Sequence, residues 1–341
     1  MVDWIRVDAS KTVFAVSEVD EIKRAADVLC ATVEREFALL PAPNNSRMIC
    51  YVTLASPSYE WGLRVLLRSL RKVSQVPVIV LSSQRWIFEC PEPNVLFVEV
   101  PGLNNVLLKP QRDEFRETLT KLWVFGLTCF RRVTFVDVDC LFLRSIDDLF
   151  GLDDFVCGAD YVVNSTEKGF NSGLLSFEPT RELRDYIFEQ APHTPSRDGG
   201  DQGLLNELLR SRVRLLPPEY DVLRHFHHYG GVELKRSEVR MIHYIVKKPW
   251  ELGARESLDL ALADLDDLWT SQLTHDELLE LVASWRRTVH ISRWNAAVDA
   301  AARQRRARRR QRTRIIITVA AILLGLVFFY FGYIVGGAHR A

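Results

Sequence analysis

Short, continuously apolar segments alternate with amphipathic segments through most of this chain. Residues 48–55, 77–82 and 95–100 have the apolar character of strands that are buried on both faces. Residues 61–71 instead place leucines at the spacing of one helix face. Strands that alternate with helices of about ten to fifteen residues are typical of a mostly parallel, twisted sheet with helices on both faces. The sequence therefore predicts an α/β fold.

The remaining pattern extends this alternation. We expect further strands over residues 132–138 and 174–177 and helices over residues 19–39, 117–129 and 202–211. The chain contains neither the GxGxxG fingerprint of dinucleotide sites nor the GxxxxGK(S/T) phosphate loop. Ligands of such sheets bind at the carboxyl ends of the strands. Polar residues that follow a strand are therefore the first candidates for a functional site.

One of the apolar strands ends in two carboxylates, Asp137 and Asp139, which a single residue separates. At a strand end the alternation of side chains breaks, so both carboxylates can turn toward one cation. A divalent cation held there would neutralise a diphosphate leaving group. Acids at strand ends also serve solubility and helix capping, so the pair by itself is a weak indication of a metal site.

Three further segments carry polar side chains that suit sugars, phosphates or metals. The glycine-rich turn of residues 198–203 opens a helix and lets backbone N–H groups approach a ligand. Asn171 precedes a strand and offers an amide that donates and accepts hydrogen bonds. Another strand ends with His243, a candidate third metal ligand, before Lys248, a candidate phosphate partner. The alternatives are an ordinary helix cap and a structural histidine.

Taken in order, these motifs resemble those of glycosyltransferase family 8, in its glycogenin-like branch. The resemblance implies a glycosyltransferase A-type fold and retaining transfer of a sugar from a UDP-sugar, with Mn²⁺ as the cofactor. It covers residues 48–251. The matching segments are Tyr51–Tyr59, Arg112–Leu122, Asp137–Asp139 with the trailing Ile146–Phe150, Asp198–Gly203, and His243 with Lys248–Trp250.

The same resemblance implies a role for each matching residue. The metal ligands would be Asp137, Asp139 and His243. The UDP moiety would contact Leu54, Ser56, Tyr59, Arg112, Val138 and Lys248, with Tyr59 stacked on uracil. The donor sugar would contact Asn171, Ser172, Asp198 and Gln202, and the catalytic group would be Asp201 with Lys121 and Asp160. Asp201 would either stabilise an oxocarbenium-like centre or act as a nucleophile.

The C-terminal region differs sharply from the rest in composition. Residues 315–337 contain no charged side chain. As a helix this segment would be about 34 Å long, enough to cross a hydrocarbon core of roughly 30 Å. Nine of the 44 basic residues follow residue 300 and none of the 44 acidic ones does, so residues 1–300 carry a net charge of −9. An acidic body argues against a nucleic-acid partner.

The charge around the apolar segment predicts an orientation. Eight arginines lie within residues 303–314, just before it, and only Arg340 follows it. Such asymmetry places the N-terminal side in the cytosol. The first residues show no apolar core of a signal peptide, and six cysteines without CxxC spacing suit a reducing compartment. We therefore expect a single-pass, tail-anchored membrane protein whose catalytic domain is cytosolic.

These features divide the chain into five segments. Residues 1–46 form an N-terminal helical extension and residues 47–252 the catalytic domain. A helical connector (253–302), a basic juxtamembrane segment (303–314) and a transmembrane helix (315–337) follow.

We expect a Mn²⁺-dependent enzyme that moves a hexose or uronic acid from a UDP-sugar to an acceptor at or near the membrane, such as a lipid or a membrane glycoconjugate. One alternative is a glycogenin-like primer that glucosylates itself, with Tyr229 as the candidate acceptor. A second alternative is an inactive transferase fold that serves as a tail-anchored scaffold. A homodimer is compatible with each of these.

Overall fold

The computed structural model describes residues 2–41, 48–104, 118–160, 169–224, 237–245, 248–251 and 268–284. The chain divides into two units, Met1–His275 and Asp276–Ala341. The described part of the second unit, residues 276–284, is helical. The fold and the candidate site belong to the first unit.

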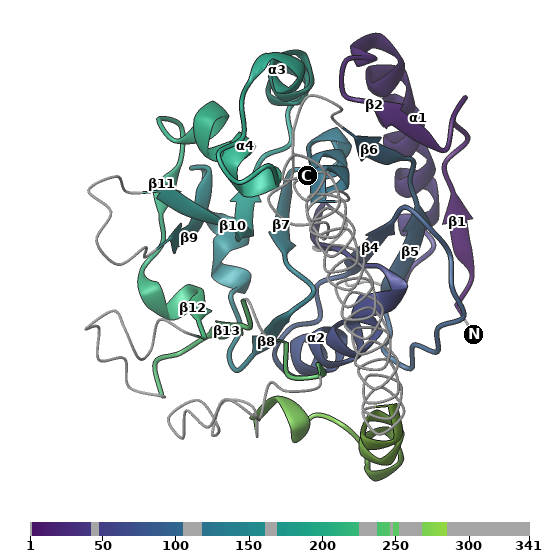
Figure 1. The fold of residues 1–341 in the computed structure, drawn as a ribbon, viewed down its shortest axis with the longest axis vertical. Coiled ribbons are helices and arrows are strands. Elements are labelled where there is room, and N and C mark those ends of the chain that lie inside the picture. Colours follow the sequence, from purple (N-terminus) through teal and green to yellow (C-terminus); the bar gives the residue numbers. More distant parts are fainter. Residues whose placement is uncertain are drawn as a thin grey trace, which may run out of the picture. The chain divides into compact units, whose positions relative to one another are not determined.

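A central sheet organises the first unit (Figure 1). Eight strands in the described part of the chain form it, in the order β1-β5-β4-β3-β7-β10-β9-β11. β10 is antiparallel to both β7 and β9, and the other neighbouring pairs are parallel. In sheet order the strands are Trp4–Arg6, Val95–Glu99, Val78–Ser82, Ile49–Leu54, Arg132–Val136, Gly169–Phe177, Val156–Asp160 and Arg214–Leu215. The predicted α/β fold with a mostly parallel sheet is therefore confirmed.

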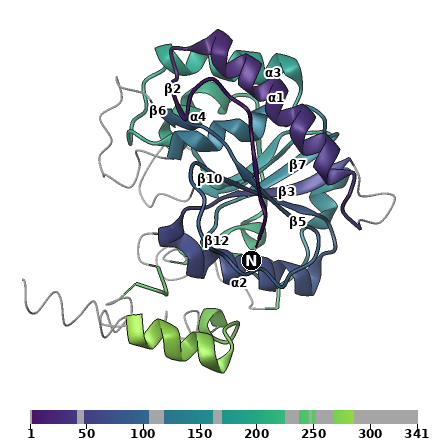
Figure 2. The ribbon, with the colours of Figure 1, turned by 90° about the vertical axis from the view of Figure 1, so that its right-hand side faces the viewer.

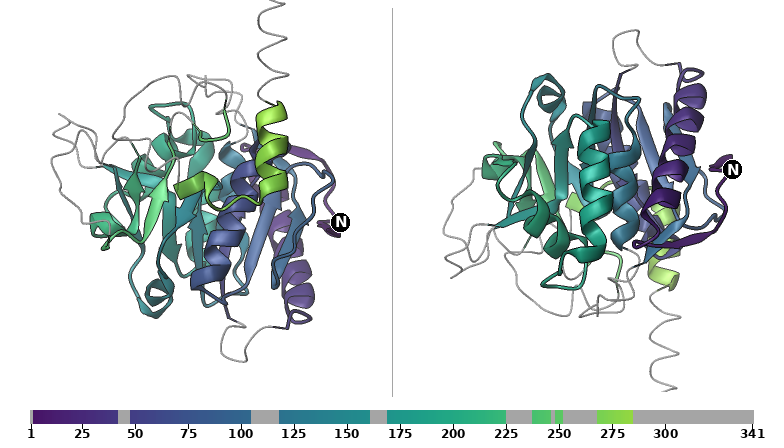
Figure 3. Two further views of the ribbon diagram at one scale, coloured as in Figure 1. Left: turned by 90° about the horizontal axis from the view of Figure 1, so that it is seen from below. Right: turned by 90° about the horizontal axis from the view of Figure 1, so that it is seen from above.

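Helices cover both faces of this sheet. α1, α3 and α4 lie on one face and α2 on the other (Figures 2 and 3). Successive side chains of β3 point to opposite faces of the sheet and so belong to two hydrophobic clusters. Cys50 and Val52 pack in the cluster that contains α1, and Tyr51 packs in the cluster that contains α2. The helices are α1 (Val19–Phe37), α2 (Glu60–Val73), α3 (Arg181–Gln190) and α4 (Asp201–Leu209), with short 3₁₀ helices at Pro57–Tyr59, Asp147–Gly151, Ala191–His193 and Pro218–Tyr220.

The helix expected over residues 117–129 differs from its prediction. The structure has a 3₁₀ helix, η4, over Thr118–Gly126 instead of an α-helix. Every residue from Leu119 to Gly126 is buried, so no single amphipathic face determines its backbone. Packing is close, since a Cβ on Gly126 would lie 3.1 Å from the Cβ of Ala26 in α1. Tertiary contacts thus override the helical pattern of the sequence.

The N-terminal segment is integrated into the same core. We predicted one helix there, and α1 occupies it with Leu29 and Val33 fully buried. Two strands accompany the helix: β1 pairs in parallel with β5 at the edge of the main sheet, and β2 (Val13–Ala15) pairs with β6 (Gly102–Asn104). All six cysteines lie among the described residues, and each is a free thiol.

A second, three-stranded sheet lies beside the main one and has the order β12-β13-β8. β13 (Met241–His243) pairs in parallel with β12 (Val222–Leu223) and antiparallel with β8 (Cys140–Phe142). β8 follows β7 after a short turn, so this small sheet connects distant parts of the sequence to the carboxyl end of β7.

The membrane segment lies outside what the structure describes. Within the described ranges, no helix is both long and apolar enough to cross a bilayer. The predicted transmembrane helix, residues 315–337, and the arginine-rich segment, residues 303–314, both fall outside those ranges.

Burial of α1 leads to a test of whether residues 1–41 belong to the domain core. Leu29 is fully buried, so Leu29→Ala should lower the free energy of unfolding by about 2–5 kcal/mol. The neighbouring Val28 is 37% exposed, and Val28→Ala should change it by less than about 0.5 kcal/mol. Urea denaturation of the full chain in detergent, followed by tryptophan fluorescence, measures both. Equal, small effects would show that α1 is not part of the cooperative core.

Candidate active site

The two carboxylates of the Asp-x-Asp motif lie in the turn between β7 and β8. The Asp137 N–H donates to the Gly173 carbonyl on β10 (2.8 Å), and the Cys140 N–H donates to the Asp137 carbonyl (3.2 Å). β7 is paired on both sides, with β3 and β10. The turn is therefore anchored to the rigid centre of the main sheet, at the carboxyl end of β7.

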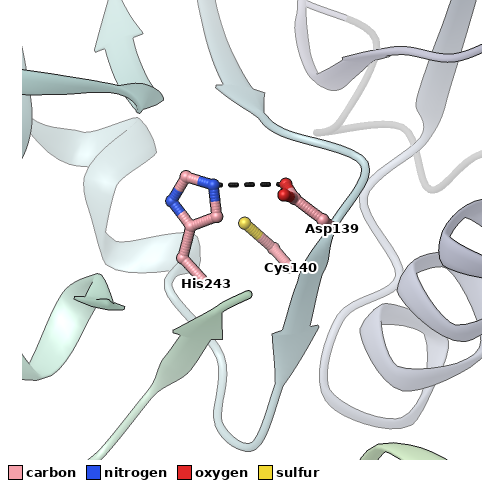
Figure 4. Close-up of side chains that lie close together, drawn as sticks. All are labelled: Asp139, Cys140 and His243. Carbon is pink, nitrogen blue, oxygen red and sulfur yellow. Dashed lines mark ion pairs between the residues drawn. The ribbon is translucent and has the colours of Figure 1, made fainter. Parts of the chain in front are cut away.

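His243 reaches this turn through the small sheet. β13 pairs with β8 so that His243 lies opposite Cys140. The His243 Nε2 lies 3.2 Å from Asp139 Oδ1 (Figure 4). It lies 3.7 Å from Asp137 Oδ2. The three side chains predicted as metal ligands thus converge. Asp139 and His243 are buried, whereas the Asp137 side chain is 29% exposed, so Asp137 is the member of this group most open to solvent.

Cys140 also lies in this cluster, which the sequence did not indicate. Its Sγ, a carboxylate oxygen of Asp139 and a ring nitrogen of His243 all lie within 4.8 Å of one another. Metals bind the thiolate, however, and burial raises the pKa of the Cys140 thiol well above its ordinary value. The side chain also packs into the hydrophobic cluster under α2. Asp137 is therefore a better third ligand than Cys140 for a hard divalent cation.

Two lysines compensate the carboxylates. Lys121, on η4, places Nζ 3.0 Å from Asp137 Oδ1 and 2.6 Å from Asp201 Oδ2. Lys248 pairs with Asp139 and donates to the Tyr244 carbonyl (3.0 Å). The charges consequently alternate in sign along the row Asp201, Lys121, Asp137, His243, Asp139, Lys248.

This alternation determines the protonation states. Burial alone would lower the pKa of Lys121, but its two carboxylate partners outweigh burial and raise it. Burial alone would raise the pKa of Asp139, but Lys248 and His243 hold it well below its usual range. Burial would likewise lower the pKa of His243, whereas Asp139 and Asp221 raise it to about 10. Without a cation the imidazole is therefore charged at neutral pH.

The residues predicted to contact the donor sugar lie around the start of α4. The Ser172 hydroxyl donates to Asp201 Oδ2 (2.7 Å), and its N–H donates to the Gln202 side chain (3.3 Å). Gln202 in turn donates to Asp160 Oδ2 (3.1 Å). The side-chain oxygen of Asn171 accepts from the N–H of Gly173 (2.8 Å). The structure thus joins four of the predicted residues, Asp160, Ser172, Asp201 and Gln202, in one hydrogen-bonded network.

Asp198, predicted to contact the donor sugar, is held within the glycine-rich turn. Its carboxylate turns back into the glycine-rich turn and accepts from the N–H groups of Gly200 (2.9 Å) and Gly203 (3.1 Å). Gly199 adopts a φ of 75°, which favours glycine, and a Cβ on Gly203 would lie 2.5 Å from Asp198 Oδ1. Asp198 therefore shapes the turn that presents Asp201.

Three of the residues predicted to contact UDP, Leu54, Ser56 and Val138, lie at or just after the ends of β3 and β7, which are parallel neighbours. Leu54 ends β3, and Ser56 bonds Ser58 just after it (2.9 Å). The Tyr59 ring packs edge-on against Trp250 (centroids 5.7 Å apart) and lies 5.9 Å from Lys248 Nζ. Val138 presents its carbonyl to α2, where a Cβ on Gly62 would approach it to 2.9 Å. Arg112 lies outside the described residues.

One further residue was missed by the sequence analysis. The buried carboxylate of Asp221 lies on the far side of His243, with Oδ1 3.5 Å from Nδ1. No sequence signal marks it, because it follows a Pro-Pro-Glu-Tyr segment and precedes a strand of two residues.

Known proteins resemble this chain in sequence. The sequence model described as Glycosyl transferase family 8 matches residues 92–253. Glycogenin-1 of Homo sapiens is 27% identical over 249 residues, which cover 68% of this chain and 69% of that protein. UDP-glucuronate:xylan alpha-glucuronosyltransferase 1 of Arabidopsis thaliana is 30% identical over 153 residues, which cover 42% of this chain and 22% of that protein.

Solved structures show the same fold. The galactosyltransferase LgtC, in complex with donor and acceptor sugar analogues, has a TM-score of 0.50 at 15% identity, covering 66% of this chain and all (100%) of LgtC. The bifunctional glycosyltransferase WbbM has a TM-score of 0.52 at 15% identity, covering 69% and 51%. The predicted resemblance is confirmed: this chain is similar to glycosyltransferase family 8 and to glycogenins, and these likenesses support a UDP-sugar glycosyltransferase.

Proposed function

We propose that this enzyme transfers a hexose or uronic acid from a UDP-sugar, with retention of configuration, to an acceptor at or near a membrane, and that it requires Mn²⁺. The observation that carries the proposal is the row of alternating charges at the carboxyl end of β7. Three potential metal ligands lie at its centre, Lys248 lies at one end, and Lys121 with Asp201 lies at the other.

The metal part of the proposal rests on the donor atoms. Two carboxylates and one imidazole, fixed by paired strands, suit a divalent cation such as Mn²⁺. Asp137, Asp139 and His243 would hold it. When bound, the cation would supply positive charge against the diphosphate that leaves with UDP. Lys248 lies near enough to Tyr59 for one residue to meet the phosphates while the other meets the base.

The catalytic part rests on Asp201. Lys121 and the Ser172 hydroxyl both bind its Oδ2, so the carboxylate is held in one orientation. Oδ1 is then the oxygen that would face the anomeric carbon. That arrangement supports either stabilisation of an oxocarbenium-like centre or direct nucleophilic attack by Asp201. Gln202 and Asp160, linked to Ser172, would orient the sugar hydroxyls.

The membrane part rests on sequence. We propose that residues 315–337 anchor the enzyme, that the eight arginines of residues 303–314 lie on the cytosolic side, and that the catalytic domain is cytosolic. An anchored enzyme meets lipid or membrane-bound acceptors at high local concentration. This favours a lipid or membrane glycoconjugate as the acceptor over a glycogenin-like self-glucosylating primer.

Metal dependence can be tested at Asp139. Asp139→Asn removes one ligand charge and should lower UDP-sugar turnover by about 100-fold or more, measured as Mn²⁺-stimulated UDP release from a panel of UDP-sugars. Cys140→Ala is the matched control, and it should retain most of the activity because Cys140 packs in the hydrophobic cluster under α2 and is not an expected ligand. Full activity of the unaltered enzyme in EDTA, or of Asp139→Asn in Mn²⁺, would contradict the metal assignment.

The acceptor can be tested by mass spectrometry. We expect the purified chain, incubated with UDP-glucose and Mn²⁺, to gain no ladder of hexose masses, because its acceptor is a separate molecule. Tyr229→Phe is the control, since Tyr229 is the candidate self-acceptor and lies outside the described residues. A ladder of several hexoses that disappears in Tyr229→Phe would establish the primer function instead.

The orientation can be tested by glycosylation mapping in a eukaryotic host. A sequon appended after Ala341 should be glycosylated, whereas the natural sequons at Asn44 and Asn164 should stay unmodified. The membrane potential and anionic cytosolic lipid both oppose translocation of the arginine-rich segment. Protease outside sealed microsomes should digest the catalytic domain. N-glycans on Asn164 in a protected domain would reverse the orientation.

A further inference from the structure

The Asp221 carboxylate differs from the buried carboxylates of Asp139 and Asp201 in the described part of the chain. Asp221 is 2% exposed, and neither of its oxygens has a hydrogen-bond partner within the described ranges. The Nδ1 of His243, which faces it, also lacks a hydrogen-bond partner there. A buried carboxylate without a donor is strongly disfavoured, so its presence calls for a structural reason.

The small sheet places Asp221 and Asp139 on opposite sides of the His243 imidazole. β13 carries His243 and is the central strand, and each of its neighbours is preceded by an aspartate: β8 by Asp139 and β12 by Asp221. Backbone pairing holds both sides, since the Tyr244 N–H donates to the Asp139 carbonyl (3.0 Å) and the Arg224 N–H donates to the His243 carbonyl (2.8 Å). The imidazole therefore has one carboxylate at each nitrogen: Oδ1 of Asp139 lies 3.2 Å from Nε2, and Oδ1 of Asp221 lies 3.5 Å from Nδ1.

The Asp221 carboxylate and the His243 ring fit against the main sheet because the residues facing them, Gly158 and Gly173, have no side chain. A Cβ on Gly158, in β9, would lie 2.2 Å from Oδ2 of Asp221. A Cβ on Gly173, in β10, would lie 2.2 Å from Cε1 of His243. Non-bonded atoms do not approach this closely, so any larger residue at either position would displace Asp221 or the imidazole. The main sheet thus closely encloses the pair.

We infer that Asp221 is a positioning residue that accepts the Nδ1–H of His243 and thereby directs the Nε2 lone pair toward Asp137, Asp139 and their cation. A neutral imidazole has one proton, and the hydrogen bond made by one nitrogen determines which nitrogen is free to ligate. A carboxylate at Nδ1 also makes Nε2 a more basic ligand. This inference rests on the proposed metal site, and it adds a fourth residue to it.

The test measures Mn²⁺ binding to the full chain in detergent, from the loss of the EPR signal of free Mn²⁺ during titration. Asp221→Leu should weaken the affinity by about 10–100-fold, the range typical of partners that orient metal ligands. Asp221→Asn keeps the shape and an accepting oxygen, so it should restore most of the affinity lost in Asp221→Leu. Asp148→Asn is the control for charge: it removes an exposed carboxylate that pairs with Arg240, and it should leave the affinity unchanged.

A second measurement does not depend on any variant at Asp221. The ¹⁵N spectrum of the histidine-labelled chain with Mg²⁺, assigned by comparison with His243→Gln, should show His243 protonated at Nδ1. Protonation at Nε2, or equal Mn²⁺ affinities of the unaltered chain and Asp221→Leu, would overturn this inference and leave the metal site intact. Failure of the unaltered chain to bind Mn²⁺ would overturn the proposed metal site and this inference together.

Discussion

The charges at the carboxyl end of β7 are stable in a largely buried position because they alternate in sign. A buried ion is strongly disfavoured when it loses its partner, and each carboxylate here touches at least one cation. Lys121 joins Asp201 to Asp137, and Lys248 meets Asp139. The compensation is mutual, so removal of one member of the row leaves its neighbours uncompensated. The fold must therefore keep each charged residue of the site next to its partner.

That constraint explains why several distant elements meet at one edge of the sheet. β7 ends in the two aspartates, η4 supplies Lys121, α4 begins with Asp201, and β13 brings His243 against β8. None of these elements could shift by one residue without separating a charge from its partner. The close contacts allowed by Gly173 and Gly158 act in the same way, because they leave no room for a different orientation of His243 or Asp221.

The same arrangement suits the chemistry of a UDP-sugar. In the proposed function, Lys248 and a cation would offset the negative charge of the diphosphate, and the donor sugar would lie beside Asp201. The relatives include proteins named as glycogenins and as glucuronosyltransferases. The similarity to glycosyltransferase family 8 favours an enzyme over an inactive scaffold.

The sequence by itself determined the features that depend on neighbouring residues. Runs of apolar residues marked the strands, the leucine spacing of residues 61–71 marked α2, and an apolar strand that ends in Asp137 and Asp139 marked the site. Local periodicity and short motifs are sufficient for such assignments. The family motifs added Lys121, Asp201 and His243, which the structure does bring together.

Only the tertiary structure decided what depends on residues far apart in the chain. It replaced the helix predicted over residues 117–129 with η4, because that segment is buried on all sides. In the folded chain the Asp198 carboxylate accepts a hydrogen bond from the loop that carries it, and Cys140 lies in the core. Asp221 lies beside the Nδ1 of His243. These outcomes follow from the pairing of β13 with β8 and β12 and from close packing against β9 and β10, which no local pattern encodes.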